Sequence, residues 1–89
     1  MDIMTHHLVP SQAVRTVSVD EALVVIDSRS GQYFGLNEIG ARIWCLVQEG
    51  THTRDIISNI STEYDADPET ISADIQRILG ELVAAGLLN

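Results

Sequence analysis

The stretch ALVVIDSRSGQYFGL, residues 22–36, decides the fold. Residues 22–27 carry apolar side chains on both faces of an extended chain, which predicts a strand in the middle of a sheet. Residues 28–31 read as a hairpin loop, in which Gly31 is free to take a positive φ. Residues 32–36 then supply the next strand. The stretch therefore predicts two neighbouring antiparallel strands.

Upstream of this hairpin, residues 14–18 have high strand propensity and add a third strand. The short connections on both sides of 22–27 predict an antiparallel meander, with 14–18 and 32–36 as its two edges. Residues 1–12 show no such pattern, and we expect them to form a flexible N-terminal segment. The folded domain is accordingly expected over residues 13–89.

Three segments with helical periodicity follow the sheet. The apolar face of the first helix is expected at Ile39, Ile43, Leu46 and Val47. The expected starts and ends are Asn37 as the cap of a helix over 38–48, Thr51 or Thr53 as the cap of the second, Asp67 with Pro68 at the start of the third, and Ala85 with Gly86 at its end. The chain is thus predicted to be an α+β domain, a three-stranded antiparallel sheet followed by three helices in a winged helix-turn-helix-like arrangement.

Composition narrows the possible partners. The chain has 89 residues, five arginines, no lysine, thirteen carboxylates and a formal net charge of −8. Nucleic-acid binding depends on neutralising phosphates with Lys and Arg, so this charge disfavours it, and it disfavours anionic membrane surfaces equally. No apolar run approaches the ~20 residues of a membrane helix. We expect an acidic domain suited to a basic partner.

Catalytic and metal-binding motifs are missing from the sequence. The single cysteine, Cys45, can form no internal disulfide, which favours a cytoplasmic compartment, and its place beside Trp44 in a helix predicts a small half-buried side chain. The three histidines have no metal-ligand spacing, and there is no phosphate-binding glycine loop. We therefore expect no enzyme, no cofactor and no metal site.

The last two expected helices form the outline of a DNA-binding helix-turn-helix. In such a protein the second helix would carry Arg or Lys toward the groove. Here it offers Arg77 alone, against the carboxylates Glu69, Asp74 and Glu81. Repulsion from phosphates should dominate, so a DNA-binding regulator is retained only as an alternative.

The strand at 32–36 has an undefended edge. Exposed edges are usually blunted by charge or proline, and this strand carries neither. Such an edge beside an amphipathic helix suits β-augmentation, in which a peptide is added as a further strand. An equally good reading is that the edge is simply short, or covered by the N-terminal segment. Alternation allows only one of Tyr33 and Phe34 to face the helices.

The order and spacing of several motifs resemble the PqqD-like family, from about residue 9 to the end of the chain. The motifs that carry the resemblance are Val25-Ile26-Asp27, Gly31-x-Tyr33-Phe34-x-Leu36-Asn37, Gly40-Ala41-x-Ile43-Trp44, Glu49-Gly50-Thr51, the turn from Asp65 to Glu69, and the closing Asp74-Ile75 … Leu79 … Leu82 … Gly86-Leu87-Leu88. Within the family, the Asp27-x-Arg29-x-Gly31 loop is similar to small stand-alone proteins of lasso-peptide biosynthesis.

The resemblance implies a recognition element for the precursors of ribosomally made, modified peptides. Members of the family bind a leader peptide as an added strand, in the groove between the third strand and the third helix. In lasso systems the partner enzyme is a separate cysteine-protease-like leader peptidase. The alternative within the family is a chaperone that delivers a precursor peptide to a radical SAM enzyme of quinone-cofactor biosynthesis.

The candidate peptide-binding residues come from the third strand and the third helix. On the helix, Asp67, Asp74 and Glu81 are seven apart and fall roughly on one stripe, which could pair with a lysine-rich leader or be an ordinary solvated face. The candidates are Gln32, Tyr33, Phe34, Gly35 and Leu36 of the strand, and Asp67, Ile71, Asp74, Ile75 and Ile78 of the helix.

Overall fold

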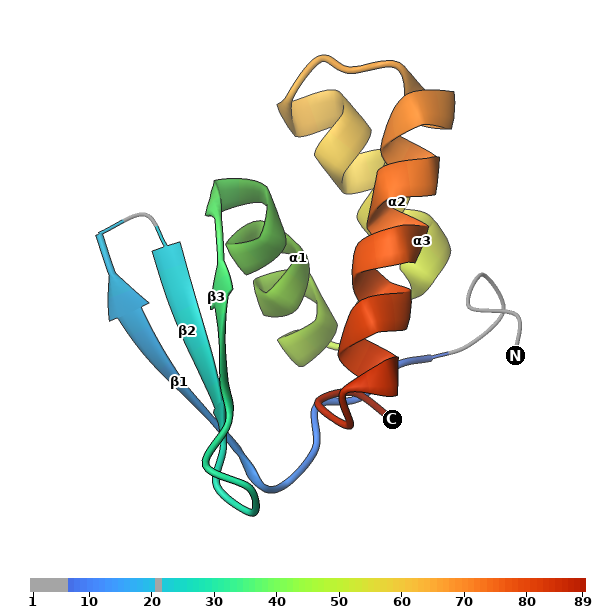
Figure 1. Ribbon diagram of the computed structural model, residues 1–89. Helices are drawn as coiled ribbons and strands as arrows, with labels where there is room; N and C mark the ends of the chain where they lie inside the picture. The colour runs from blue at the N-terminus through green and yellow to red at the C-terminus, as the bar shows by residue number, and fades with distance from the viewer. Residues whose placement is uncertain (1–6, 21) are drawn as a thin grey trace.

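Three strands come first in the chain and three helices follow, as Figure 1 shows for the computed structural model, which describes residues 7–20 and 22–89. The strands are β1 (Val14–Val19), β2 (Ala22–Asp27) and β3 (Tyr33–Leu36). The helices are α1 (Glu38–Gln48), α2 (Thr53–Glu63) and α3 (Pro68–Ala84). The predicted α+β order, sheet first and helices second, is confirmed.

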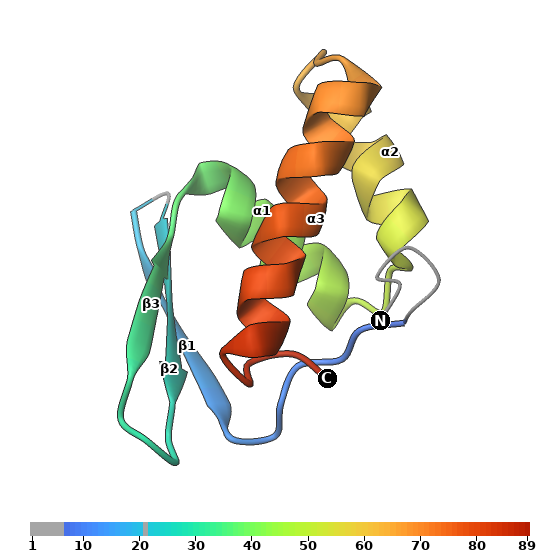
Figure 2. The ribbon, with the colours of Figure 1, turned by 45° about the vertical axis from the view of Figure 1, so that its right-hand side comes forward.

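The sheet is an antiparallel meander with the order β1-β2-β3, so β2 is the central strand as predicted. The register places Val25 opposite both Thr16 of β1 and Phe34 of β3. One face of β2 is buried against the helices, whereas Val24 and Ile26 on the other face are only half-buried. Burial on both faces was expected, but in the described part of the chain the helices cover only one side of the sheet (Figures 1 and 2).

The register also settles which aromatic residue of β3 faces the helices. Phe34 pairs with Val25, which is fully buried, and Phe34 packs against the core. Tyr33 pairs with Ile26 on the opposite face, and its side chain is 75% exposed. Because side chains alternate along a strand, Leu36 shares the face of Phe34.

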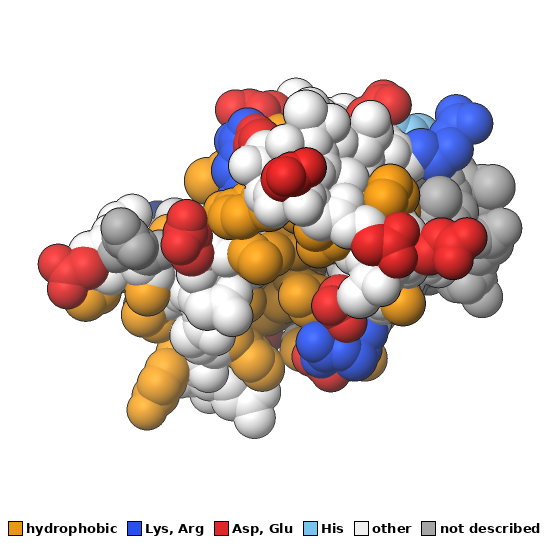
Figure 3. Space-filling model, turned by 90° about the horizontal axis from the view of Figure 1, so that it is seen from above, with side chains coloured by type: hydrophobic (Ala, Val, Ile, Leu, Met, Phe, Trp, Pro, Cys, Tyr) orange, Lys and Arg blue, Asp and Glu red, His pale blue; other side chains and the backbone are white. Residues whose placement is uncertain are grey.

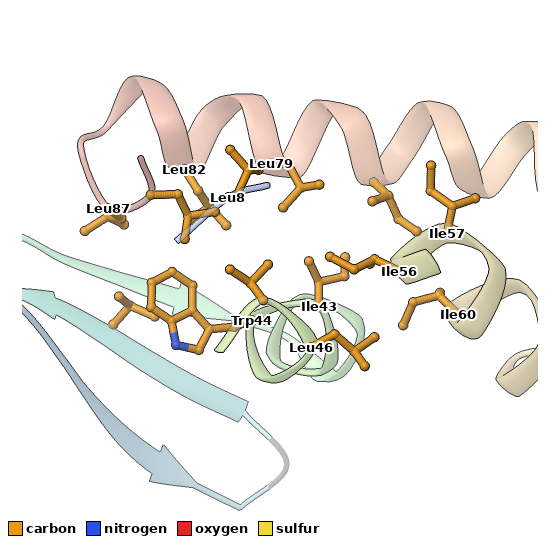
Figure 4. Close-up of a cluster of buried hydrophobic side chains, with 14 of the residues drawn as sticks. Leu8, Ile43, Trp44, Leu46, Ile56, Ile57, Ile60, Leu79, Leu82 and Leu87 are labelled. Carbon is orange, nitrogen blue, oxygen red and sulfur yellow. The ribbon is translucent and has the colours of Figure 1, made fainter. Parts of the chain in front are cut away.

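Helix α1 begins where predicted, because the Asn37 side chain accepts a hydrogen bond from the Gly40 N–H at 2.9 Å. Its inward face differs in two respects from the expected one. Trp44 is completely buried, and Figure 4 shows it near Leu8 and Leu87, with an indole Nε1 that has no hydrogen-bond partner among the described residues. Cys45 is exposed rather than half-buried, because at ~100° per residue it points away from the buried arc of this helix.

The second and third helices have well-defined starts. His52 caps α2, its Nδ1 accepting from the Arg54 N–H at 3.3 Å, so the expectation of Thr51 or Thr53 is wrong; Thr53 is already the first helical residue. Asp67 caps α3 as predicted. After α3 the chain takes a left-handed turn at Gly86, with φ of 79°, and the Leu87 N–H donates back to the Leu82 carbonyl at 3.0 Å.

The segment before β1 lies against the C-terminal end of the chain. Val9 and Asn89 exchange backbone hydrogen bonds of 3.0 and 2.8 Å, and the Ser11 N–H donates to the Leu87 carbonyl at 2.9 Å. Leu8 is 2% exposed and belongs to the core (Figure 4). A flexible segment was expected over residues 1–12; Val9 and Ser11 are instead hydrogen-bonded to the C-terminal end of the chain and Leu8 is buried, whereas residues 1–6 lie outside the described part of the chain.

Helices α2 and α3 form the expected helix-turn-helix, joined by a short turn in which Asp65 has a φ of 48°. On α3, Arg77 pairs with Glu81 at 3.2 Å, so the one basic side chain of this helix is already neutralised by its own neighbour. Across residues 7–20 and 22–89, no helix combines the length and the apolar character that crossing a membrane requires.

Candidate functional site

A groove of about 540 Å³ runs between β3 and α3. Figure 3 shows hydrophobic side chains gathered in the hollow between the sheet and the helices. The lining residues come from β3, from the start of α1 and from the C-terminal half of α3: Tyr33, Phe34, Gly35, Leu36, Asn37, Gly40, Arg77, Ile78, Glu81 and Leu82.

The outer edge of β3 forms one side of this groove and has no strand paired to it in the described sheet. The Asp27 N–H donates to the Gln32 carbonyl at 2.9 Å, which makes these two residues a hydrogen-bonded pair. Backbone groups alternate along an antiparallel strand, so Phe34 and Leu36 direct theirs toward β2. The N–H and C=O groups of Tyr33 and Gly35 therefore point outward and are available to another strand.

The floor of the groove is apolar. Phe34 and Leu36 from β3 and Ile78 from α3 are half-buried, so each packs against the core and keeps part of its surface open. Leu82, one turn further along α3, is 4% exposed. If a ligand places apolar side chains here, both its surface and the groove surface are removed from water. This burial stabilises the complex by about 25 cal/mol per Å² of apolar surface.

One oppositely charged pair stands at the rim. Arg77 Nη1 and Glu81 Oε1 are 3.2 Å apart on successive turns of α3, and both side chains are more than half exposed. An exposed pair with this spacing stabilises a helix by only ~0.3–0.5 kcal/mol, so either partner can be diverted to a ligand at little cost.

The sequence-predicted residues divide into two groups. Tyr33, Phe34, Gly35, Leu36 and Ile78 line the groove, and Gln32, exposed, immediately precedes β3. The remaining four lie outside the groove lining, at these places: Ile71 and Ile75 in the core, Asp67 at the far end of α3, and Asp74 exposed on α3.

The three carboxylates of the predicted acidic stripe are placed differently with respect to the groove. Asp67 is engaged as the helix cap, accepting from the Glu69 N–H and the Thr70 hydroxyl. Asp74 lies beyond the upper end of the groove, and only Glu81 lines it. Spacing along a helix gives the direction of a side chain but not which stretch of the helix faces the strand.

Five of the lining residues were not among the ten candidates, although Glu81 had been placed on the acidic stripe: Asn37, Gly40, Arg77, Glu81 and Leu82. The helical period already joins Ile78 to Leu82 and Arg77 to Glu81 as i,i+4 neighbours, so extending the candidate face by one turn would have found two of them. Gly40 packs closely against β3, because a Cβ there would lie 3.2 Å from Leu36 Cβ and would need a small shift of that side chain.

The outer face of the sheet is a second apolar surface that reaches the groove. By register and alternation it is formed by Arg15, Val17, Val19, Ala22, Val24, Ile26, Tyr33 and Gly35. Val17 and Val19 are about half exposed. This set contains no carboxylate although the chain has thirteen, so the negative charge lies elsewhere.

A hollow of about 570 Å³ lies at the start of α2, away from the sheet. It is lined by polar or small residues: Glu49, Gly50, Thr51, His52, Asp55, Ser58 and Asn59. Within the described ranges, no group of three or more His, Cys, Asp or Glu side chains could hold a metal ion. We take the β3–α3 groove as the candidate site, because it alone joins an open strand edge to apolar walls.

Comparison with known proteins finds solved structures with the same fold. A solved structure described as "TbiB1 in Complex with the TbiA(beta) Leader Peptide" is 34% identical to this chain, with a TM-score of 0.86, and the match covers 91% of this chain and 94% of that one. A second, "Lasso peptide synthetase B1 complexed with the leader peptide", has the same TM-score at 23% identity, covering 94% and 99% of the two chains, which shows a shared fold.

No curated protein sequence matches the chain. The family model "Coenzyme PQQ synthesis protein D (PqqD)" matches residues 22–88, which include the whole groove. The chain therefore belongs to the PqqD family.

Proposed function

We propose that this protein is a non-catalytic adaptor that binds the leader peptide of a ribosomally made lasso-peptide precursor and presents it to a leader peptidase. The observation that carries the proposal is the open edge of β3 above an apolar groove. A leader in extended conformation would pair with the outward N–H and C=O groups of Tyr33 and Gly35. A match of 34% identity to a protein solved with a leader peptide supports it.

Side chains on the two faces of the added strand would have different roles in recognition. Those directed toward the helices would enter the groove between Phe34, Leu36 and Ile78. Backbone pairing accepts any non-proline sequence, so selectivity for the leader would come from these apolar contacts. Ile75 is fully buried, and we leave it out of the contact surface.

Charge would assist recognition without dominating it. A lysine-rich leader suits the net charge of −8, and Asp74 is an exposed carboxylate on α3, one turn before Ile78 and just beyond the groove lining. Each exposed ion pair contributes ~0.2–1 kcal/mol and is screened by salt. Electrostatic attraction should therefore raise the association rate more than the final affinity.

The leader peptidase, a cysteine-protease-like enzyme in our proposal, would dock on the outer face of the sheet. A strand added to β3 extends that same face, since every second leader side chain would lie beside Tyr33 and Gly35. An enzyme seated on this carboxylate-free apolar surface would contact adaptor and leader together. The single exposed thiol, Cys45, is consistent with the reducing cytoplasm where we place the complex.

Delivery of a precursor to a radical SAM enzyme is the alternative that the family match keeps open, and it would use the same groove. The similarity to two proteins solved with leader peptides, one of them described as a lasso peptide synthetase B1, favours the lasso system. DNA binding is disfavoured because α3 carries one cation, Arg77, against the carboxylates Glu69, Asp74 and Glu81, and the net charge is −8.

Titration of the purified protein with a fluorescein-labelled leader tests the proposal, the peptide being that of the precursor encoded beside this chain's gene. We expect saturable binding followed by anisotropy, no binding of a scrambled peptide, and no binding of a DNA duplex at low salt. Backbone amide signals of Tyr33 and Gly35 should shift on binding. Binding of duplex DNA, or equal binding of the scrambled peptide, would overturn the proposal.

A further inference from the structure

A single side chain joins the β2–β3 hairpin to the end of α3. Arg29 Nη2 donates to the Gly86 carbonyl at 3.1 Å across a sequence separation of 57 residues. Among the hydrogen bonds that the described residues make, it is the one that links the hairpin loop to the turn after α3. Figure 2 shows both segments at the same end of the molecule. Tyr33 and Leu82 line the groove at the same end of the molecule.

Arg29 is held in place by Asp27. The Asp27 carboxylate accepts from the Arg29 N–H at 2.9 Å, from Nε at 3.1 Å and from Nη2 at 3.3 Å. The Asp27 side chain is 9% exposed, on the helix side of β2, whereas that of Arg29 is 60% exposed. A buried carboxylate with a fixed position thus orients a guanidinium that would otherwise be free to rotate.

The end of α3 is suited to receive this guanidinium. The last turn of α3 contains no basic residue, so its carbonyl groups carry an uncompensated partial negative charge. Arg29 supplies the missing cation from the sheet. Glycine at position 86 is favoured by its φ of 79°, and Arg29 Nη2 lies close to it, 3.4 Å from where a Cβ would stand.

We infer that Arg29 is a positioning residue for peptide binding: oriented by Asp27, it holds the end of α3 at the hairpin and so sets the width of the β3–α3 groove. The inference rests on the proposed function. An added strand lies ~4.8 Å from β3, and side chains from α3 must reach it from a fixed distance. Leu82 is one turn before Gly86, so movement of this helix end moves the groove wall directly.

Arg29→Ala tests this, with Arg42→Ala as a matched control. Arg42 makes a comparable bidentate pair with Glu63, at 2.8 Å, between α1 and α2 and outside the groove lining. We expect Arg29→Ala to raise the Kd for the labelled leader about 5-fold, mainly through faster dissociation, and Arg42→Ala to leave it unchanged. Circular dichroism and urea midpoints confirm that both variants are folded.

Asp27→Asn separates positioning from direct contact with the peptide, because Asp27 is buried and does not line the groove. It should weaken binding to a similar extent as Arg29→Ala, and the double variant should be no weaker than either one. Ile78→Ala should also cost less in the Arg29→Ala background than in the wild type, since the wall it removes has already moved. If Asp27→Asn binds as wild type while Arg29→Ala is weak, Arg29 touches the leader itself and the inference is wrong.

The failures of the two proposals are distinguishable. If the wild-type protein does not bind the leader, the proposed function fails. If the wild type binds and both Arg29→Ala and Asp27→Asn bind equally well, the adaptor function stands and the positioning role of Arg29 fails. Should Arg29→Ala not fold, Arg29→Lys replaces it, because lysine keeps the charge but lacks the planar guanidinium whose Nε and Nη2 contact Asp27 and Gly86 together.

Discussion

The sheet has two open edges, and only one of them is equipped to hold a peptide. The edge of β1 carries polar or charged residues such as Arg15, Thr16 and Ser18 and has no helix beside it (Figure 1). The edge of β3 carries no charge and faces α3 across an apolar groove. Unpaired backbone groups are therefore common to both edges, and the apolar walls are what distinguish a binding site from a strand end.

The largest effect should come from removing a backbone donor at the β3 edge. Gly35→Pro eliminates an outward N–H and places a ring on the edge, so we expect leader binding to fall more than 100-fold in anisotropy titrations. Gly35→Ala keeps the donor, and its Cβ meets no atom within 4 Å, so this variant should bind nearly as wild type. As a control for folding, the circular dichroism spectrum of Gly35→Pro must match that of the wild type.

The matching change at the other edge is Thr16→Pro. The Ser28 N–H donates to the Ala13 carbonyl, so by alternation the Thr16 N–H also points away from β2. This variant should bind the leader as wild type does. A comparable loss in Thr16→Pro would show that proline acts by disturbing the sheet, and the contrast between the edges would disappear.

A smaller effect is expected from the wall of the groove. Ile78→Ala removes apolar contact with the leader and should weaken binding about 10-fold, which corresponds to 1.4 kcal/mol. The same kind of truncation beside the β1 edge, Val17→Ala, should leave leader affinity unchanged. Isothermal titration calorimetry of the two variants measures the difference, and equal affinities would remove Ile78 from the site.

Lowering the pH should destabilise the β2–β3 hairpin, because it protonates Asp27. The hydrogen bonds from the Arg29 side chain and backbone hold the pKa of Asp27 below its usual value. A lowered pKa in the folded state contributes stability that is present above the unfolded pKa, about 3.9, and is lost as pH falls through the folded value. Asp27→Asn should therefore show a shallower loss of stability below pH 4, measured by urea unfolding at several pH values. An unchanged acid profile would contradict this.

The smallest effect should come from surface charge. Asp74→Arg should weaken binding of a lysine-rich leader about 3-fold at low salt and hardly at all at 0.5 M salt, because exposed pairs are weak and screened. Glu49→Arg changes the net charge equally at the C-terminal end of α1, outside the groove lining, and serves as the control. If both variants weaken binding to the same extent, leader affinity depends on the net charge of the protein and not on the position of Asp74.

Much of this fold could be predicted because its signals are local. The apolar run in 22–27, the cap at Asn37 and the Asp67-Pro68 start each depend on a few neighbouring residues. The candidate site was harder to predict from sequence, because its geometry depends on contacts between distant parts of the chain. The orientation of Phe34 depends on its register with Val25, and the position of Asp74 depends on where α3 crosses β3. The bond from Arg29 to Gly86 spans 57 positions and has no local signal at all.

The burial of Trp44, the only tryptophan in the sequence, determines what intrinsic fluorescence can measure in this protein. Trp44 lies in the centre of the core with 0% exposure and does not line the groove. Its emission should be blue-shifted in the folded state and should move to the red only when the core opens. Intrinsic fluorescence thus follows unfolding and stays silent during peptide capture, so one sample can yield stability from tryptophan and affinity from a labelled leader.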